Sequence, residues 1–226
     1  MTDIDDHRTQ ANALRPFPEC ERFKVMCDTK EAQGLPALFV SAKTTTAVPV
    51  RHPALRDALI QASLDPRVRS IDYVASARVA SAQVTLDAVI VQHEDGRYLL
   101  DVVPARRVRD IEDEGLVLIA LGELKLKPLV LTAEEIRREP RHANASLVWS
   151  HNDVPVPIGL RMRILQVLLD EGPMPLGQLL KSVAGESDLA AAVMALACAN
   201  LVCLDLLAQP LSPTTLVRCC AQADPA

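Results

Sequence analysis

The spacing of apolar residues changes several times along the chain, and each change predicts a different element. In the segment 52–64 apolar residues recur at helical spacing, and Pro53 suits the first turn of the expected helix. The pair Asp65 and Pro66 ends this helix, because proline disfavours helical backbone at the residue before it. The apolar run over 68–74 then predicts a strand.

A β-hairpin is the clearest element in the sequence. The apolar segments 84–92 and 97–103 flank a turn in which Asp95 and Gly96 favour left-handed backbone. Both arms carry apolar residues on both faces, which is typical of strands in the middle of a covered sheet. We therefore expect the hairpin to form the centre of a sheet.

Elements on either side of the hairpin complete an α/β pattern. Helical spacing predicts a helix over 106–123, and residues 128–131 predict a short strand. Thr132 and Glu135 have the spacing of a capping box, which predicts the start of a further helix. Short apolar runs at 23–26 and 35–41 indicate additional strands near the N-terminus.

The pattern changes near residue 150. The segment 152–157 predicts a linker, and residues 201–207 predict a wing strand. Between them, three helical stretches are expected at 158–170, 176–183 and 188–200. Three compact helices and a strand predict a small winged helix-turn-helix domain. The expected division is a loose leader over 1–22, a first domain over 23–150, the winged-helix domain over 151–220 and a tail over 221–226.

Composition limits the classes of function. The chain has 24 Lys+Arg against 29 Asp+Glu, and this net charge of -5 excludes a protein that coats nucleic acid by bulk charge. Any nucleic-acid site must therefore be a local patch. A hydrophobic fraction of 49% excludes wholesale disorder. The 8 glycines include no glycine-rich phosphate loop.

Compartment and covalent chemistry follow from a few segments. The acidic first residues lack the pattern of a secretion signal, so we expect a cytoplasmic protein. Residues 189–208 are strongly apolar, but Asn200 and Asp205 interrupt them, which predicts a packed core helix and no membrane contact. None of the six cysteines has zinc-site spacing, so buried or free thiols are expected.

Two carboxylates are the main candidates for chemistry. Asp87 and Asp101 are the only acidic residues within the hairpin arms. If paired residue numbers sum to about 190, both lie on one face of the sheet, where a divalent cation could offset their repulsion. Two alternatives stay open: the register differs by one residue, or each carboxylate accepts hydrogen bonds from backbone donors at a strand end.

Arginines gather near the same hairpin. Arg97, Arg106, Arg107 and Arg109 could contact DNA phosphates, or they could form a solvated helix start that the following acidic residues balance. A second local excess of arginine runs from Arg51 to Arg78. In contrast, residues 150–226 carry a net charge of -3, and the expected recognition helix at 188–200 has no Lys or Arg. A protein-contact role is therefore favoured for the winged helix.

The order of these elements resembles the restriction-endonuclease-like PD-(D/E)XK fold, a mixed sheet flanked by helices. More narrowly, residues 35–218 resemble the TnsA-type transposon endonucleases, which join a nuclease domain to a C-terminal winged helix. The supporting segments are 55–68, Leu86-Asp87 at the PD position, Tyr98 to Val103 at the (D/E)XK position, and 131–144 at the helix joining the two halves.

The resemblance implies that Asp87 and Asp101 bind Mg²⁺ and that a lysine assists the attacking water. Here Val103 occupies the lysine position and Leu86 the proline position, and the acidic residue expected on the first helix falls near Leu55 or Arg56. Valine cannot stabilise charge, and losing such a group typically costs about 10²–10³ in rate. Arg106 or Arg107 could replace the lysine from the following helix.

We therefore expect a TnsA-like protein associated with DNA transposition, a pseudo-nuclease that acts as a scaffold. Its expected partners are DNA at the hairpin and a transposase-type protein at the winged helix. Two alternatives remain: an active Mg²⁺-dependent DNA endonuclease that cuts phosphodiester bonds at element ends, and a winged-helix transcriptional regulator.

Overall fold

The structure is a computed structural model that describes residues 36–79, 82–183 and 188–220. The predicted leader over 1–22, the run at 23–26 and the tail over 221–226 lie outside the described residues. We call residues 36–150 the N-terminal half and residues 151–220 the C-terminal half.

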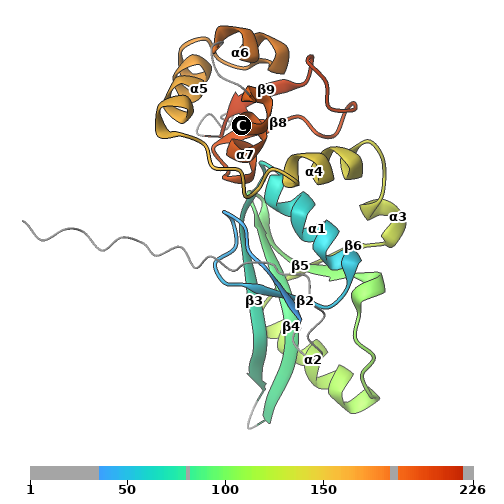
Figure 1. Cartoon of the computed structure of the whole chain (residues 1–226). Coiled ribbons are helices and arrows are strands. Elements are labelled where there is room, and N and C mark those ends of the chain that lie inside the picture. The colour runs from blue at the N-terminus through green and yellow to red at the C-terminus, as the bar shows by residue number, and fades with distance from the viewer. Residues whose placement is uncertain (1–35, 80–81, 184–187, 221–226) are drawn as a thin grey trace, which may run out of the picture. The chain divides into compact units, whose positions relative to one another are not determined.

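The elements of both halves are shown in Figure 1. The N-terminal half contains β1 (Ala37–Phe39), β2 (Val48–Val50), α1 (Pro53–Leu64), β3 (Val68–Val79), β4 (Ala82–His93), β5 (Gly96–Val102), the 3-10 helix η1 (Val103–Ala105), α2 (Ile111–Glu123), β6 (Lys127–Leu131), α3 (Ala133–Ile136) and α4 (Arg141–Trp149). The C-terminal half contains α5 (Ile158–Asp170), β7 (Met174–Pro175), α6 (Leu176–Ser182), α7 (Leu189–Cys198), β8 (Val202–Leu204) and β9 (Leu216–Cys219).

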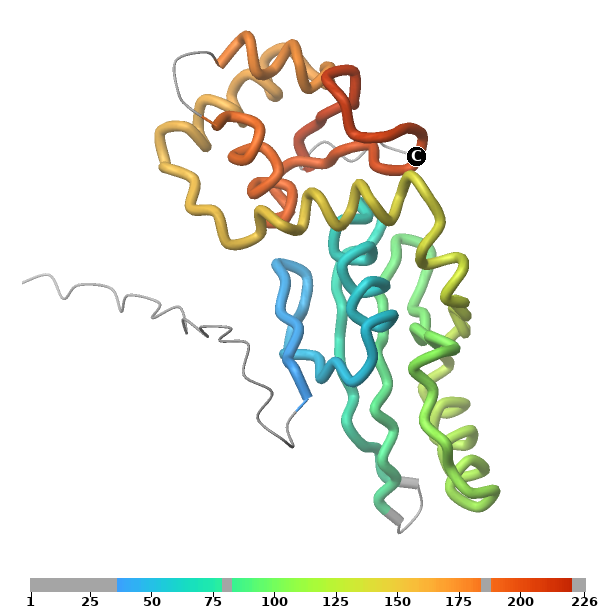
Figure 2. Tube along the Cα trace, turned by 45° about the vertical axis from the view of Figure 1, so that its right-hand side comes forward, coloured from blue at the N-terminus to red at the C-terminus, as the bar shows by residue number. Residues whose placement is uncertain are grey.

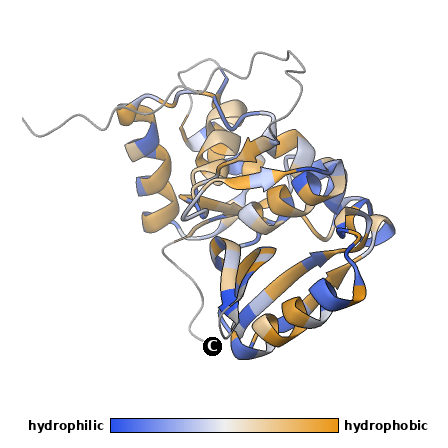
Figure 3. Ribbon diagram, turned by 90° about the horizontal axis from the view of Figure 1, so that it is seen from below, coloured by the Kyte–Doolittle hydropathy of each residue, from blue (hydrophilic) through white to orange (hydrophobic). Residues whose placement is uncertain are grey.

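A mixed four-stranded sheet forms the centre of the N-terminal half. Its order is β3-β4-β5-β6, in which β5 pairs parallel with β6 and the other neighbours are antiparallel. Val89 and Leu100 pack in one hydrophobic cluster with α1, whereas Leu86 and Ala88 pack in another with α2. The predicted α/β class, with a mixed sheet flanked by helices, is confirmed. Figure 3 shows that hydrophobic and hydrophilic residues both occur along these helices and strands.

Local signals explain where the helices begin. Thr132 and Glu135 form the predicted capping box at the start of α3. The helix predicted over 106–123 begins only at Ile111, because Val103–Ala105 form η1 and the Asp110 side chain caps α2 by accepting from the Asp113 N–H. This later start leaves the segment 106–110 outside any helix, so its arginines extend from a loop.

The C-terminal half combines three helices with a three-stranded antiparallel sheet of order β7-β9-β8. Eight consecutive residues of α7, 191–198, are buried, so the strongly apolar segment is a core helix as predicted. No helix in the described part of the chain is long and apolar enough to cross a membrane.

The two halves pack against each other through α4, which contacts both α1 and α7 (Figure 2). Trp149, at the end of α4, packs against the hydrophobic clusters of both halves. Its ring stacks on that of Phe39, with centroids 5.1 Å apart.

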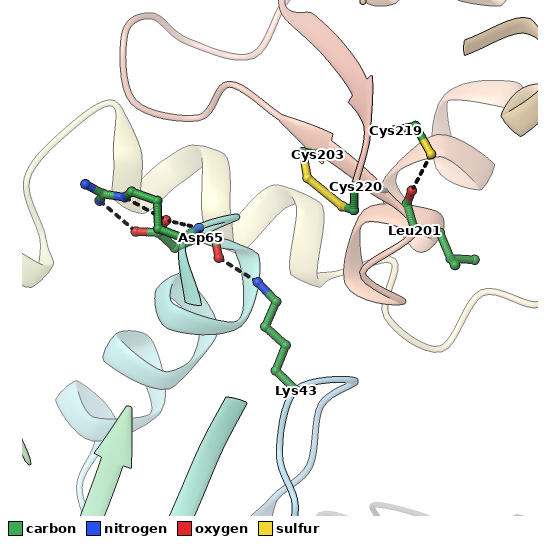
Figure 4. The surroundings of a disulfide bond; sticks show 7 residues. Lys43, Asp65, Leu201, Cys203, Cys219 and Cys220 are labelled. Atoms are coloured by element: carbon green, nitrogen blue, oxygen red, sulfur yellow. Dashed lines mark hydrogen bonds and ion pairs between the residues drawn. A yellow bond between two sulfur atoms is a disulfide. The ribbon is translucent and has the colours of Figure 1, made fainter. Parts of the chain in front are cut away.

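One covalent link differs from the prediction of thiols. Cys203 and Cys220 form a disulfide, with Cα atoms 5.6 Å apart (Figure 4). The pairing of β8 with β9 explains the link, because Cys203 lies opposite Arg218, two residues from Cys220. Cys198 and Cys219 are buried and free, as the sequence predicted for them.

Candidate functional site

A cavity of about 340 Å³ lies where β4 and β5 separate. The two strands pair from His93 with Gly96 to Val89 with Leu100, and their pairing ends there. Both candidate carboxylates lie just beyond this last pair. We call this space the hairpin cavity; its charged lining residues are Arg51, Asp87, Asp101, Arg106, Arg107, Arg109 and Glu114.

The hairpin register differs by one residue from the principal prediction. Paired residue numbers sum to 189 because only Glu94 and Asp95 form the loop. Val89 therefore lies opposite Leu100, whereas a sum of 190 places it opposite Asp101. The structure therefore confirms the alternative stated above, in which the hairpin register differs by one residue. Strand alternation alone consequently does not place the two carboxylates on one face.

A β-bulge in β4 places Asp87. The pairing of β4 with β3 shifts between Val74–Ala88 and Ser76–Thr85, so that β4 has one extra residue there. Asp87 adopts left-handed backbone with φ of 48°, a conformation that aspartate tolerates better than most residues. A bulge redirects side chains, and here it brings the Asp87 carboxylate into the hairpin cavity.

The Asp87 carboxylate is enclosed by donors from three elements. Arg51, which follows β2, donates from Nη1 to Oδ2 at 3.0 Å, and Arg107 donates to the same oxygen. The Tyr73 hydroxyl of β3 donates to Oδ1. Burial, together with this hydrogen bond, raises the pKa of Tyr73 to about 12. Both oxygens of Asp87 are therefore engaged by neutral or cationic donors.

Asp101 has a single cationic partner in a two-pronged geometry. Arg106 donates from Nε to Oδ1 at 2.8 Å and from Nη2 to Oδ2 at 2.5 Å. The η1 turn, which includes Pro104, brings Arg106 back over the end of β5. The hydrogen bonds from Arg106 to Asp101 raise the pKa of the arginine. Such fork-shaped pairs fix both side chains in one orientation.

The other predicted arginines occupy different places. Arg109 lines the hairpin cavity, donates to the Leu86 carbonyl at 3.0 Å and lies 3.6 Å from Glu114, so it supports the bulge next to Asp87. Arg97 is near the opposite end of β5, beside the hairpin turn, and does not line the cavity. The structure thus brings together Arg106, Arg107 and Arg109 but not Arg97.

Sequence reasoning missed two contributors. Arg51 belongs to the second local excess of arginine, and nothing in the sequence links it to Asp87, which lies 36 residues away. Tyr73 lies in the predicted strand over 68–74 and gave no separate signal. Their contacts with Asp87 depend on the folded sheet, and residue spacing does not encode them.

The arrangement does not fit a divalent cation well. Four arginines face three carboxylates in the hairpin cavity, a net charge of +1. Among the described residues, no group of three or more His, Cys, Asp or Glu side chains could hold a metal ion. An ion at Asp87 or Asp101 would also have to displace the arginines that bind these carboxylates. Val103 begins η1, and its side chain offers no charge at this point.

Comparison with known proteins does not add a family. No family model matches the chain. No curated protein matches it in sequence. The resemblance to TnsA-type endonucleases therefore stays a proposal from the sequence.

Proposed function

We propose that this chain is a catalytically inactive, TnsA-like protein that binds the DNA backbone at the hairpin cavity and acts as a scaffold in DNA transposition. The element order supports a restriction-endonuclease-like N-terminal half: a helix, a strand, a hairpin, a helix and a strand. The order of α5 to β9 and the sheet order β7-β9-β8 support a winged helix in the C-terminal half.

The observation that carries the proposal is the convergence of arginines on the hairpin cavity. The side chains of Arg51, Arg106 and Arg107 are about half exposed, so part of each guanidinium remains accessible to an incoming phosphate. Arginine suits phosphate oxygens because its planar donors can engage two of them at once. The aspartates neutralise part of the charge of these arginines, and the cavity keeps a net positive charge.

The same contacts favour a scaffold over a nuclease. Both acidic positions are already ion-paired, and the lysine position holds Val103. Arg106, the candidate substitute for that lysine, is bound to Asp101 by two hydrogen bonds. Arg106 therefore neutralises a carboxylate and is not positioned to assist an attacking water.

The C-terminal half is better suited to a protein partner than to DNA bases. The segment expected to read DNA, 188–200, corresponds to α7, in which residues 191–198 are buried. Ile158 and Met162 are exposed one helical turn apart on α5 and form an apolar surface. We propose that a transposase-type protein docks on this half, and that the protein acts in the cytoplasm, where it meets DNA. Disulfides are rare in that compartment, whereas the structure pairs Cys203 with Cys220. A thiol reagent added to intact cells before lysis should label Cys203 if the protein is cytoplasmic, and a Cys203 that is labelled only after reduction would contradict this location.

A DNA-binding titration tests the phosphate site. Fluorescence anisotropy with a short labelled duplex should show that Arg106→Gln and Arg107→Gln each weaken binding several-fold and reduce the salt slope by about 1. Arg97→Gln is the matched control, because Arg97 lies outside the hairpin cavity. Equal losses in all three variants would refute the assignment of this cavity.

The alternative of an active Mg²⁺-dependent endonuclease rests on the presence of both acidic positions in one cavity. A plasmid-nicking assay with Mg²⁺ or Mn²⁺ should show no cleavage above background for the wild type. Metal-dependent nicking that disappears in Asp101→Asn would establish the alternative and overturn the proposed inactivity.

A further inference from the structure

A second cavity lies at the junction of the two halves. Its volume is about 420 Å³, and no residue that lines it also lines the hairpin cavity. The end of α1, the start of α4, and the strands β8 and β9 enclose it. We call it the junction cavity; its charged lining residues are Asp65, Arg67, Arg141, Asp205 and Arg218.

Arg141 lacks an acceptor in this cavity. It is the first residue of α4, and no group in the described part of the chain accepts a hydrogen bond from its guanidinium. The nearby carboxylate of Asp65 is engaged by Arg67, which donates from Nε at 3.1 Å and from Nη2 at 2.9 Å. Arg141 is half-buried, and this burial lowers the pKa of its guanidinium. A guanidinium in this state gains free energy from a bound anion.

The rest of the junction cavity offers an apolar surface. Leu204 and Leu206 are buried, whereas Leu207 and Leu216 are about half exposed at its rim. Asp65 in the charged lining pairs with Arg67, and Arg141 has no acceptor among the described residues. An apolar wall with one unsatisfied cation is the composition of a small-molecule site.

The leucine wall is held in place before any ligand binds. Asn144 of α4 donates to the carbonyls of Leu206 and Gln209, at 2.9 and 2.8 Å. The pairing of β8 with β9 fixes the neighbouring strands, and Cys203 of β8 lines the cavity (Figure 4). A preformed site loses little conformational entropy when it binds a ligand.

We propose that the junction cavity binds a small organic carboxylate, whose anionic group pairs with Arg141 and whose apolar body lies against Leu204, Leu206 and Leu207. The ligand would contact both halves and so stabilise their packing. This site is separate from the proposed DNA site, and neither proposal depends on the other.

Isothermal titration calorimetry on the full chain tests the proposal, with octanoate as the probe and octanamide as its uncharged counterpart. Octanoate should bind saturably with one site per chain and at least about tenfold more tightly than octanamide, because charge-assisted hydrogen bonds contribute that much. Arg141→Gln should lower octanoate affinity by about tenfold or more. Arg137→Gln, at an exposed position outside the cavity, should leave it unchanged.

A second variant guards against misfolding of Arg141→Gln. Leu207→Asp places a negative charge at the exposed rim, where the fold tolerates it, and should also weaken octanoate binding. Equal affinity for octanoate and octanamide, unchanged binding in both cavity variants, or no saturable binding of octanoate to the wild type would each overturn the proposal.

Discussion

Asn144 joins the two halves through three hydrogen bonds and provides a sharp test of the structure. Its side chain is 3% exposed. Its Nδ2 donates to the carbonyls of Leu206 and Gln209, and its Oδ1 accepts from the Leu211 N–H at 2.8 Å. The change Asn144→Ala removes all three bonds and leaves their partners without this amide.

The expected loss follows from the number of bonds. A hydrogen bond contributes about 1 kcal/mol net, and a buried group left without a partner costs about 1–3 kcal/mol. Three bonds therefore predict a loss of about 3 kcal/mol in the free energy of unfolding, a large part of the roughly 5–15 kcal/mol typical of proteins. Asn144→Asp keeps the acceptor for Leu211 but sets a carboxylate against two carbonyl oxygens. We expect it to destabilise the fold at least as much at neutral pH.

Urea unfolding followed by tryptophan fluorescence measures this loss directly. Trp149 is the only tryptophan in the chain and packs at the junction of the halves, close to Asn144 in sequence. Asn152→Ala is the control, because Asn152 is exposed and should change stability by less than about 0.5 kcal/mol. A loss below about 1 kcal/mol for Asn144→Ala would refute the three-bond account.

Three further changes test other regions. Burial lowers the pKa of Lys43 from 10.5 to about 8, so the unfolded chain binds more protons than the folded chain between these values, and this contribution to stability rises with pH. Lys43→Met should therefore raise the free energy of unfolding relative to wild type most below pH 8, as measured by urea unfolding at several pH values. If this difference in free energy does not shrink as the pH rises to 10.5, the prediction is wrong. Asp87→Asn removes the charge that pairs with two arginines and should strengthen duplex binding at low salt in anisotropy titrations; weaker binding would count against a phosphate site. Thr132→Ala removes the capping box and should cost about 1 kcal/mol in thermal unfolding, whereas Glu134→Ala in the same turn serves as control, and equal losses would deny the cap its role.

Local signals in the sequence predicted the elements best. The helix expected over 158–170 has the same bounds in the structure, and the capping box at Thr132 is present. Both depend on residues within a few positions of one another, so a single sequence contains the necessary information. The strands of the hairpin were predicted for the same reason, because two apolar runs and the turn signal between them are adjacent in the chain.

Contacts between distant segments were harder to predict. The loop of the hairpin uses Glu94 and Asp95, and this one-residue difference reverses which side chains share a face. The bulge at Asp87 changes the orientation again, but aspartate is not a specific marker of a bulge. Sequence reasoning placed Asp87 and Asp101 on one face of the sheet from a register that was wrong. The structure brings both into one cavity through the bulge in β4.

The two cavities differ in which charged groups lack a partner. This difference explains why we propose DNA for the hairpin cavity and a small carboxylate for the junction cavity. In the hairpin cavity the aspartates are bound by arginines that also reach solvent, so a DNA backbone would gain several phosphate contacts while the pairs rearrange. In the junction cavity Arg141 donates to no acceptor in the described part of the chain, so one small anion satisfies it. Binding that neutralises several phosphates weakens steeply as salt rises, because each contact releases counterions. A single carboxylate at a partly buried arginine is screened much less. The affinity for duplex DNA should therefore fall steeply with salt concentration, whereas the affinity for octanoate should fall little. Arg141→Gln should weaken the binding of octanoate.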